Sequence, residues 1–137
     1  MYLSATDESI EILLGGTVNT NQLKWITSYQ DFTSAGMSLP MLSDQGDTNN
    51  TSVVTIVNAP TSSTTRQLAV LMVFNSDVAS ADIIIRKDKG GTPYVMYSQT
   101  LQPGDTLTWS KDLGWQLTQG VSQADVTFSV FTSNGTY

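Results

Sequence analysis

The sequence of 137 residues contains no cysteine and no histidine. Without cysteine, the chain can form neither a disulfide nor a reactive thiolate. Without histidine, it lacks the commonest general base and the commonest metal ligand, which excludes Ser-His-Asp catalysis, Cys-His catalysis and imidazole-bound zinc. Any enzymatic reaction would therefore have to rely on carboxylates.

Charged residues are scarce as well. They make up 13% of the chain, roughly half the usual share of a globular domain, and the formal net charge is −6. Binding to a nucleic-acid backbone needs clustered lysine and arginine. The one basic cluster, Arg86, Lys87 and Lys89, is interrupted by Asp88 in a predicted hairpin tip, where such residues are usually solvated. We expect no nucleic-acid partner.

Long hydrophobic runs are missing too. No apolar stretch approaches the ~20 residues needed to cross a bilayer. The N-terminal segment MYLSATDESIEILL lacks the basic region and the long apolar region of a signal peptide. We therefore expect no membrane partner, and a chain that is made and soluble in a cytoplasm.

Short segments of alternating apolar and polar residues recur along the chain at intervals of roughly ten residues, the pattern of an all-β sandwich or barrel. A helix over residues 9–14 is the alternative there, but so short a segment before Gly15 and Gly16 is unfavourable as a helix. Besides the region 101–118, the predicted strands are residues 9–14, 21–31, 53–58, 66–75, 81–87, 93–100 and 125–131.

The sequence thus predicts a single antiparallel β-sandwich domain over residues 1–137, jelly-roll-like, with about eight to nine strands. Residues 51–137 would form the sandwich core. Residues 1–50 would supply N-terminal strands, an extended N-terminal segment and a long loop.

Residues 101–118 read as strand, turn, strand, turn, strand. Pro103-Gly104 and Asp112-Leu113-Gly114 provide the two turns. Between and after them the larger residues alternate with polar ones, which predicts that these large residues lie in the core: Leu107, Trp109, Trp115 and Leu117.

Residues 66–75 form the most apolar stretch. An unbroken alternation would place Leu68, Val70, Met72 and Phe74 on one face, with Ala69, Leu71 and Val73 on the other. Apolar residues on both faces predict a strand that is covered on both sides.

Residues 32–52 show no clear periodicity, and loops of this length tend to be functional or ordered by a partner. Two readings stay open: an arm that packs on a neighbouring subunit, and a loop that crosses the open end of its own domain. Together with the stripe of large residues in the preceding strand, this region supplies the predicted partner interface: Leu23, Trp25, Tyr29, Phe32, Met37, Leu39, Met41 and Leu42.

Candidate chemical groups are few. The pair Asp44 and Asp47 and the group Asp7, Glu8 and Glu11 lie in polar or terminal contexts, where nothing desolvates a carboxylate for acid–base work. Residues 44–49 offer oxygen ligands for calcium, but their spacing does not match an EF-hand loop. We expect no catalytic residues, no metal and no cofactor.

Aromatic residues suggest one further alternative. A sugar-stacking platform could be built from Trp25, Trp109, Trp115, Tyr94 and Tyr97, although tryptophan on an alternating strand more often belongs to a core or an interface.

Three blocks of the sequence resemble a family of small tailed-bacteriophage virion proteins. The blocks are IEILLGGTVNTNQLKWITSYQDFT (residues 10–33), RQLAVLMVFNSD (residues 66–77) and LQPGDTLTWSKDLGWQLT (residues 101–118). The resemblance implies a jelly-roll-like sandwich and a place in the virion. It carries over no catalytic or metal-binding residues.

On this basis we expect a non-enzymatic virion structural protein, a capsid decoration or cement subunit. Its partners would be the major capsid protein and copies of itself, as a homo-oligomer. It would sit on the capsid surface after assembly in the host bacterial cytoplasm. A component of the neck, the tail or the fibre attachment is one alternative, and a host-glycan-binding module is another.

Overall fold

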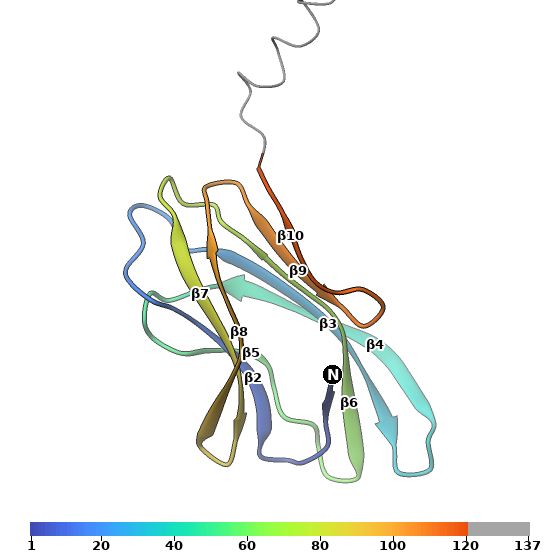
Figure 1. Ribbon diagram of the computed structural model, residues 1–137. Helices are drawn as coiled ribbons and strands as arrows, with labels where there is room; N and C mark the ends of the chain where they lie inside the picture. The colour runs from blue at the N-terminus through green and yellow to red at the C-terminus, as the bar shows by residue number, and fades with distance from the viewer. Residues whose placement is uncertain (121–137) are drawn as a thin grey trace, which may run out of the picture.

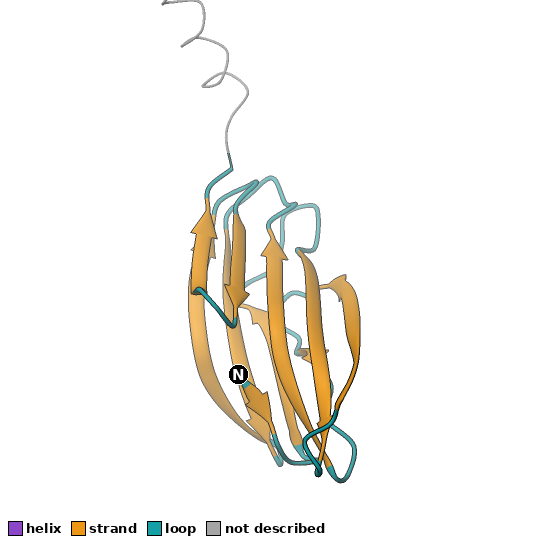
Figure 2. Cartoon of the chain, turned by 90° about the vertical axis from the view of Figure 1, so that its right-hand side faces the viewer, coloured by secondary structure: helices purple, strands orange, loops and turns teal. Residues whose placement is uncertain are grey.

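The computed structural model describes residues 1–120, and the strand predicted over residues 125–131 lies outside the described residues. Within the described part, the chain contains strands and loops but no helix (Figure 2). Its ten strands are β1 (Tyr2–Leu3), β2 (Glu8–Leu14), β3 (Lys24–Thr33), β4 (Ser38–Asp47), β5 (Val54–Val57), β6 (Thr64–Phe74), β7 (Ala81–Lys89), β8 (Thr92–Leu101), β9 (Thr106–Ser110) and β10 (Gly114–Thr118).

The strands form two sheets of unequal size that face each other (Figure 1). The six-stranded sheet has the order β10-β9-β6-β3-β4, and β1 also pairs with β6. The four-stranded sheet has the order β5-β2-β7-β8. Every pairing among these strands is antiparallel. The prediction of an all-β antiparallel sandwich is therefore confirmed.

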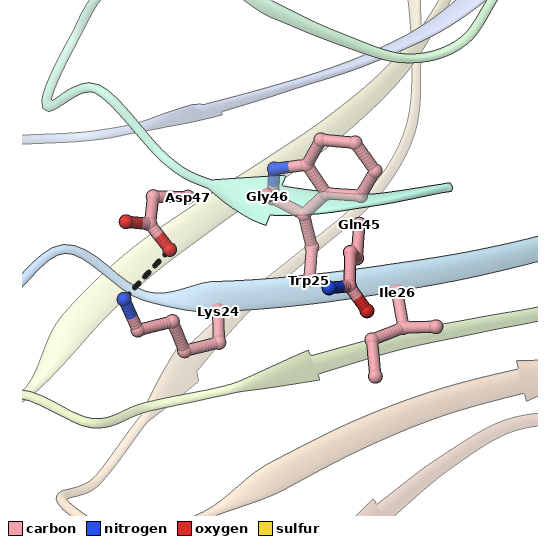
Figure 3. Close-up of a pocket in the computed structure, with 6 residues that line it drawn as sticks. All are labelled: Lys24, Trp25, Ile26, Gln45, Gly46 and Asp47. Carbon is pink, nitrogen blue, oxygen red and sulfur yellow. Dashed lines mark hydrogen bonds and ion pairs between the residues drawn. The ribbon is translucent and has the colours of Figure 1, made fainter. Parts of the chain in front are cut away.

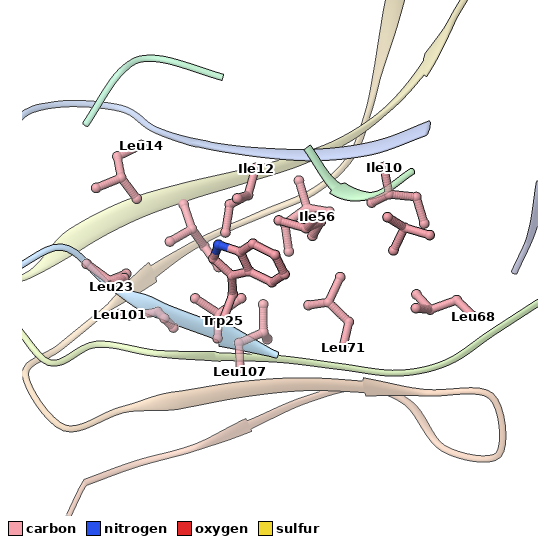
Figure 4. Packing of buried hydrophobic residues seen from close by; sticks show 14 of the residues in the cluster. Ile10, Ile12, Leu14, Leu23, Trp25, Ile56, Leu68, Leu71, Leu101 and Leu107 are labelled. Atoms are coloured by element: carbon pink, nitrogen blue, oxygen red, sulfur yellow. The ribbon is translucent and has the colours of Figure 1, made fainter. Parts of the chain in front are cut away.

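The core lies between the sheets and is built from the inward residues of both (Figure 4). In β2 the alternation Ile10, Ile12 and Leu14 is buried throughout, which is the reason that this segment forms a strand rather than a helix. The largest fully buried side chains are Leu3, Ile10, Ile12, Leu14, Leu23, Ile56, Leu68, Leu71, Ile83, Ile85, Leu101 and Leu107.

The prediction of a long loop over residues 32–52 is wrong, because most of this region is strand. A tight turn at Gly36, with φ of 81°, joins β3 to β4, and the Thr33 N–H donates to the Met37 carbonyl at 2.9 Å. Strand β4 pairs along β3 at the edge of the six-stranded sheet. Periodicity arises when one face of a strand is buried, and β4 is exposed along most of its length. Its sequence therefore carries no alternation.

The face assignment of residues 66–75 also needs correction. Strand β6 contains a bulge at Ala69, because Ser28 pairs with Val70 while the next residue, Tyr29, pairs with Leu68. A bulge shifts the alternation by one residue. Leu68 consequently faces the core, whereas Met72 and Phe74 lie on the outer face and are exposed rather than covered.

A buried ion pair joins β3 to β6 at the end of the core. The Arg66 Nε and Nη2 groups donate to the two carboxylate oxygens of Asp31 at 2.8 and 2.9 Å, and Arg66 Nη1 donates to the Asn58 carbonyl at 2.8 Å. The guanidinium also lies 4.3 Å from the centre of the Tyr29 ring. The hydrogen bonds to Asp31 raise the pKa of Arg66 despite its burial.

Replacing Asp31 with alanine should lower the free energy of unfolding by about 3–5 kcal/mol, because it leaves the Arg66 guanidinium buried without its counter-charge. Urea unfolding followed by circular dichroism measures this change. The control is Asp47→Ala, which removes the partner of Lys24 in an exposed ion pair and should cost less than about 1 kcal/mol. Equal losses in the two variants would contradict the buried role of Asp31.

The hairpin of β9 and β10 provides a second, matched test. Leu107 and Leu117 are register partners, yet Leu107 is fully buried while Leu117 is 39% exposed, which corrects the expectation that both are core. Leu107→Ala should cost about 2–5 kcal/mol in urea unfolding, because the vacated volume lies in a packed interior. Leu117→Ala should cost clearly less, and the reverse order would show that the hairpin packs differently.

Candidate interaction surface on the six-stranded sheet

Three residues of the predicted interface lie in the core instead. Leu23, Trp25 and Tyr29 are all buried, on the side of the six-stranded sheet that faces its partner sheet. Their alternation was read correctly, but the face they define is interior. The prediction that they contact a partner is therefore wrong.

Trp25 attaches β4 to the core. Its indole ring lies directly over Gly46 of β4, and a Cβ atom at position 46 would come within 2.8 Å of the ring (Figure 3). Only glycine allows this approach without a shift of the ring. The indole N–H is buried and has no hydrogen-bond partner within residues 1–120.

The end of β4 is fixed by a polar network around Gln22. The Gln22 side-chain oxygen accepts hydrogen bonds from the Thr48 hydroxyl at 2.9 Å and from the Asn50 N–H at 3.0 Å. The Thr48 N–H in turn donates to the Leu23 carbonyl at 2.9 Å. This network holds the chain as it leaves the edge strand.

The other predicted interface residues stay at the surface. Phe32 is half-buried at the end of β3. The four apolar residues of the β3–β4 hairpin, which we call the β4 flank, are between 38 and 67% exposed: Met37, Leu39, Met41 and Leu42. In Figure 1 the turn between β3 and β4 lies at the lower right, and within residues 1–120 β4 is the last strand of the six-stranded sheet. Their role in binding a partner stays a prediction.

A second apolar cluster lies on the outer face of the same sheet. Ile26, Met72 and Phe74, which we call the outer patch, are 43, 37 and 39% exposed. Ile26 pairs with Met72 across β3 and β6, and Phe74 follows two residues later on the same face. The next strand, β9, borders the patch with uncharged Thr106 and Thr108.

The sequence did not reveal the outer patch. Ile26 stands alone among polar residues on its face of β3, and the bulge at Ala69 hid the true orientation of Met72 and Phe74. The only available signal was that residues 66–75 carry apolar side chains on both faces. Such a pattern predicts a strand covered on both sides, whereas in the structure the outer face of β6 is exposed at Met72 and Phe74.

A hollow of about 370 Å³ adjoins the patch over β3 and β4 (Figure 3). Lys24 and Asp47 form an ion pair of 2.7 Å at its border, and both side chains are about half exposed. The remaining lining residues are Trp25, Ile26, Gln45 and Gly46. Such a screened pair contributes little energy.

The acidic residues do not assemble a metal site. Asp44 pairs with inward-facing Thr27 and Asp47 pairs with outward-facing Lys24, so the two carboxylates project from opposite faces of β4. Within residues 1–120, no group of three acidic side chains is placed to hold a metal ion.

Three of the five aromatic residues proposed for a sugar-stacking platform lie together, and all three are half-buried: Tyr97, Trp109 and Trp115. Trp25 is buried, and Trp115 stacks on Tyr97 with ring centres 4.4 Å apart. Trp109 meets Trp115 edge-on at 6.5 Å. Of the five aromatics proposed, only Tyr94 is strongly exposed, on the edge strand β8.

Two acidic side chains have shifted pKa values, and both stabilise the fold. Burial opposes ionisation of Asp77, but the N–H groups of Asn19, Asn21 and Thr20 outweigh it and hold the pKa of Asp77 well below its usual range. These hydrogen bonds, of 2.7 to 3.0 Å, fix the chain segment that leads from one sheet to the other.

Glu8 plays a similar part at the start of β2. Its carboxylate accepts the Ser4 N–H at 2.7 Å, and Lys87 lies 3.3 Å away. The Ser4 hydrogen bond chiefly, with Lys87, lowers the pKa of Glu8 to about 2 although burial opposes this shift. Glu8 lies in the four-stranded sheet, and Asp77 lies in the connection that follows β6.

No family model, no curated protein and no solved structure matches the chain. Within residues 1–120 there is also no helix with the length and apolar character of a membrane span.

The Glu8 geometry predicts how stability depends on pH. Because folding lowers its pKa from 4.5 to about 2, ionised Glu8 stabilises the fold fully above about pH 4.5, and this contribution is lost as the pH falls towards 2. Melting temperatures measured across this range should fall with pH in the parent protein and fall less in Glu8→Gln. Asp112→Asn, at an exposed turn, is the charge-matched control and should keep the parent's slope.

Proposed function

We propose that this chain is a non-enzymatic structural protein of a bacteriophage virion that decorates the capsid surface. The single observation that carries the proposal is the outer patch of Ile26, Met72 and Phe74 on the six-stranded sheet. The resemblance of three sequence blocks to phage virion proteins is the reason for proposing that the partner particle is a bacteriophage virion.

The outer patch has the physical properties of a docking surface. It lies on paired strands, so its side chains are held in place before a partner arrives and little ordering entropy is lost on binding. Burying apolar area contributes about 25 cal/mol per Å². On β9 the patch is bordered by uncharged threonines, whereas on β3 Lys24 lies beside Phe74 and is paired with Asp47. A partner that covers the apolar residues and leaves this ion pair in water at the rim avoids the cost of burying charge.

The titratable groups support a non-enzymatic role. Glu8 and Asp77 owe their lowered pKa values to hydrogen bonds that close turns and fix loops, not to a cleft. A glycosidase would need two carboxyl groups facing each other about 5–10 Å apart across a cleft. Asp44 and Asp47, the pair nearest the patch, diverge from opposite faces of β4.

The proposal is tested by locating the chain in intact particles with cryo-electron microscopy. Density for the sandwich on the outer shell, with its six-stranded sheet against the major capsid protein, is the expected result. Density at the neck, the tail or a fibre attachment would replace the decoration role with the alternative virion role. Absence of the chain from purified virions would overturn the proposal.

A variant in the outer patch tests whether this surface binds the particle. Ile26→Glu puts a charge at the centre of the outer patch, and burying it against the shell would be costly. We expect the amount of this variant bound to purified particles to fall at least about tenfold, equal to about 1.4 kcal/mol. Its urea midpoint should stay close to that of the parent, because Ile26 is already exposed.

Leu113→Glu is the matched control, since Leu113 is an exposed leucine in the turn between β9 and β10. This variant should bind particles as the parent does. If both variants bound equally well, the outer patch would not be the docking surface.

A further inference from the structure

The edge of β4 carries a second inference, about how two copies of the chain meet. We propose that β4 pairs antiparallel with β4 of a second copy around a two-fold axis centred on Leu42, joining the two six-stranded sheets into one. We expect the purified chain to form this dimer whether or not the virion role is correct. Only the position of the dimer in a particle rests on the proposed virion role.

The direction of the main-chain groups supports this pairing. The Thr48 N–H, just after β4, donates to the Leu23 carbonyl, just before β3, and β4 keeps a continuous register with β3 from Met41 to Asp47. Because successive residues point their N–H and C=O groups to opposite sides, the groups of Met41, Ser43 and Gln45 point away from β3. The Gln45 N–H accordingly bonds to the neighbouring Asp44 carboxylate at 2.9 Å instead of to β3.

The edge of β4 that is unpaired within residues 1–120 has little protection against pairing in its regular stretch, where Asp44 is the one inward-facing charge. Natural edge strands are commonly short, bulged or occupied by lysine. Strand β4 spans ten residues, carries no lysine or arginine, and has its irregularity only near Phe32 at the hairpin end. Its one proline, Pro40, lies outside the regular stretch.

The other edges within residues 1–120 are less suitable. Strands β5 and β10 are only four and five residues long. Strand β8 is ten residues long, but it is interrupted by a bulge at Met96 and begins with Pro93 in its second position. A bulge and a proline both hinder the addition of a strand.

Charge and side-chain direction then select the register. Leu42 and Asp44 face the inner side of the sheet, and Met41, Ser43 and Gln45 face the outer side. Directly opposite residues must share a face, so a two-fold axis has to pass through a single residue. An axis at Asp44 would oppose two carboxylates, and an axis at Ser43 would oppose Leu42 with Asp44.

The axis at Leu42 opposes neither two carboxylates nor Leu42 with Asp44, and it places Asp44 opposite Pro40 of the second copy, at the margin of the pairing. It brings two half-exposed leucines together on the inner side, where the short strand β5 leaves them uncovered. It also pairs Met41 with Ser43 of the second copy. The main-chain N–H and C=O groups of both residues point away from β3, towards the second copy, so they can form hydrogen bonds across the axis. A symmetric contact of this kind closes on itself, so it yields a dimer and not a fibre.

The absence of cysteine allows a direct test by single substitutions. Leu42→Cys should form a disulfide-linked dimer under mild oxidation, because Leu42 and its counterpart form a close pair without mutual main-chain hydrogen bonds. Ser43→Cys should link much less, since position 43 faces position 41 of the second copy. Val95→Cys on the edge of β8 is the exposed control and should stay monomeric.

Sedimentation equilibrium tests the pairing without a covalent link. The parent should show a concentration-dependent dimer, and Ser43→Pro should weaken it about tenfold or more, because one N–H is lost on each side of the axis. Circular dichroism and the urea midpoint show whether Ser43→Pro is folded. If it is not, Leu42→Lys, which opposes two like charges at the axis, replaces it and should weaken the dimer in the same way.

A monomeric parent at all concentrations would overturn the proposal, as would cross-linking of Ser43→Cys or Val95→Cys in preference to Leu42→Cys. A dimer of the purified chain that is absent from virions would leave the pairing intact and overturn only the virion role.

Discussion

The two sheets of this sandwich differ in width, and the exposure of inward-facing Leu42 fits that difference. A four-stranded sheet cannot cover the whole inner face of a six-stranded one. The four-residue strand β5 lies against both β3 and β4 at the edge of the smaller sheet, and Leu42 of the ten-residue strand β4 is half exposed although it points inward. The larger sheet therefore offers an uncovered edge and an outer face for contacts with other molecules.

Polar side chains organise the parts of the chain that the hydrophobic core cannot reach. Asp77 holds the connection that crosses between the sheets, Gln22 holds the end of β4, and Glu8 closes the turn before β2. Each of them satisfies main-chain N–H groups that would otherwise be unpaired. The fold thus reaches a defined loop structure without disulfides and with few charged residues.

The sequence predicted the fold class because alternation in β2, β3 and β7 reports burial on one face. It could not predict β4, whose two faces are both largely exposed, nor the bulge at Ala69, which depends on pairing with β3. It also could not separate core from interface for Trp25, because both environments exclude water and favour large aromatic residues.

The contact between Trp25 and Gly46 fixes the register in which β4 pairs with β3. Edge strands with exposed faces are prone to slide along their neighbours, because no buried stripe opposes the movement. A slide of β4 by two residues would bring Asp44 or Thr48 beneath the indole, and either Cβ atom would collide with the ring that Gly46 accommodates. Because Gly46 has no side chain, it fits beneath the Trp25 ring, and this contact holds β4 in one register with β3.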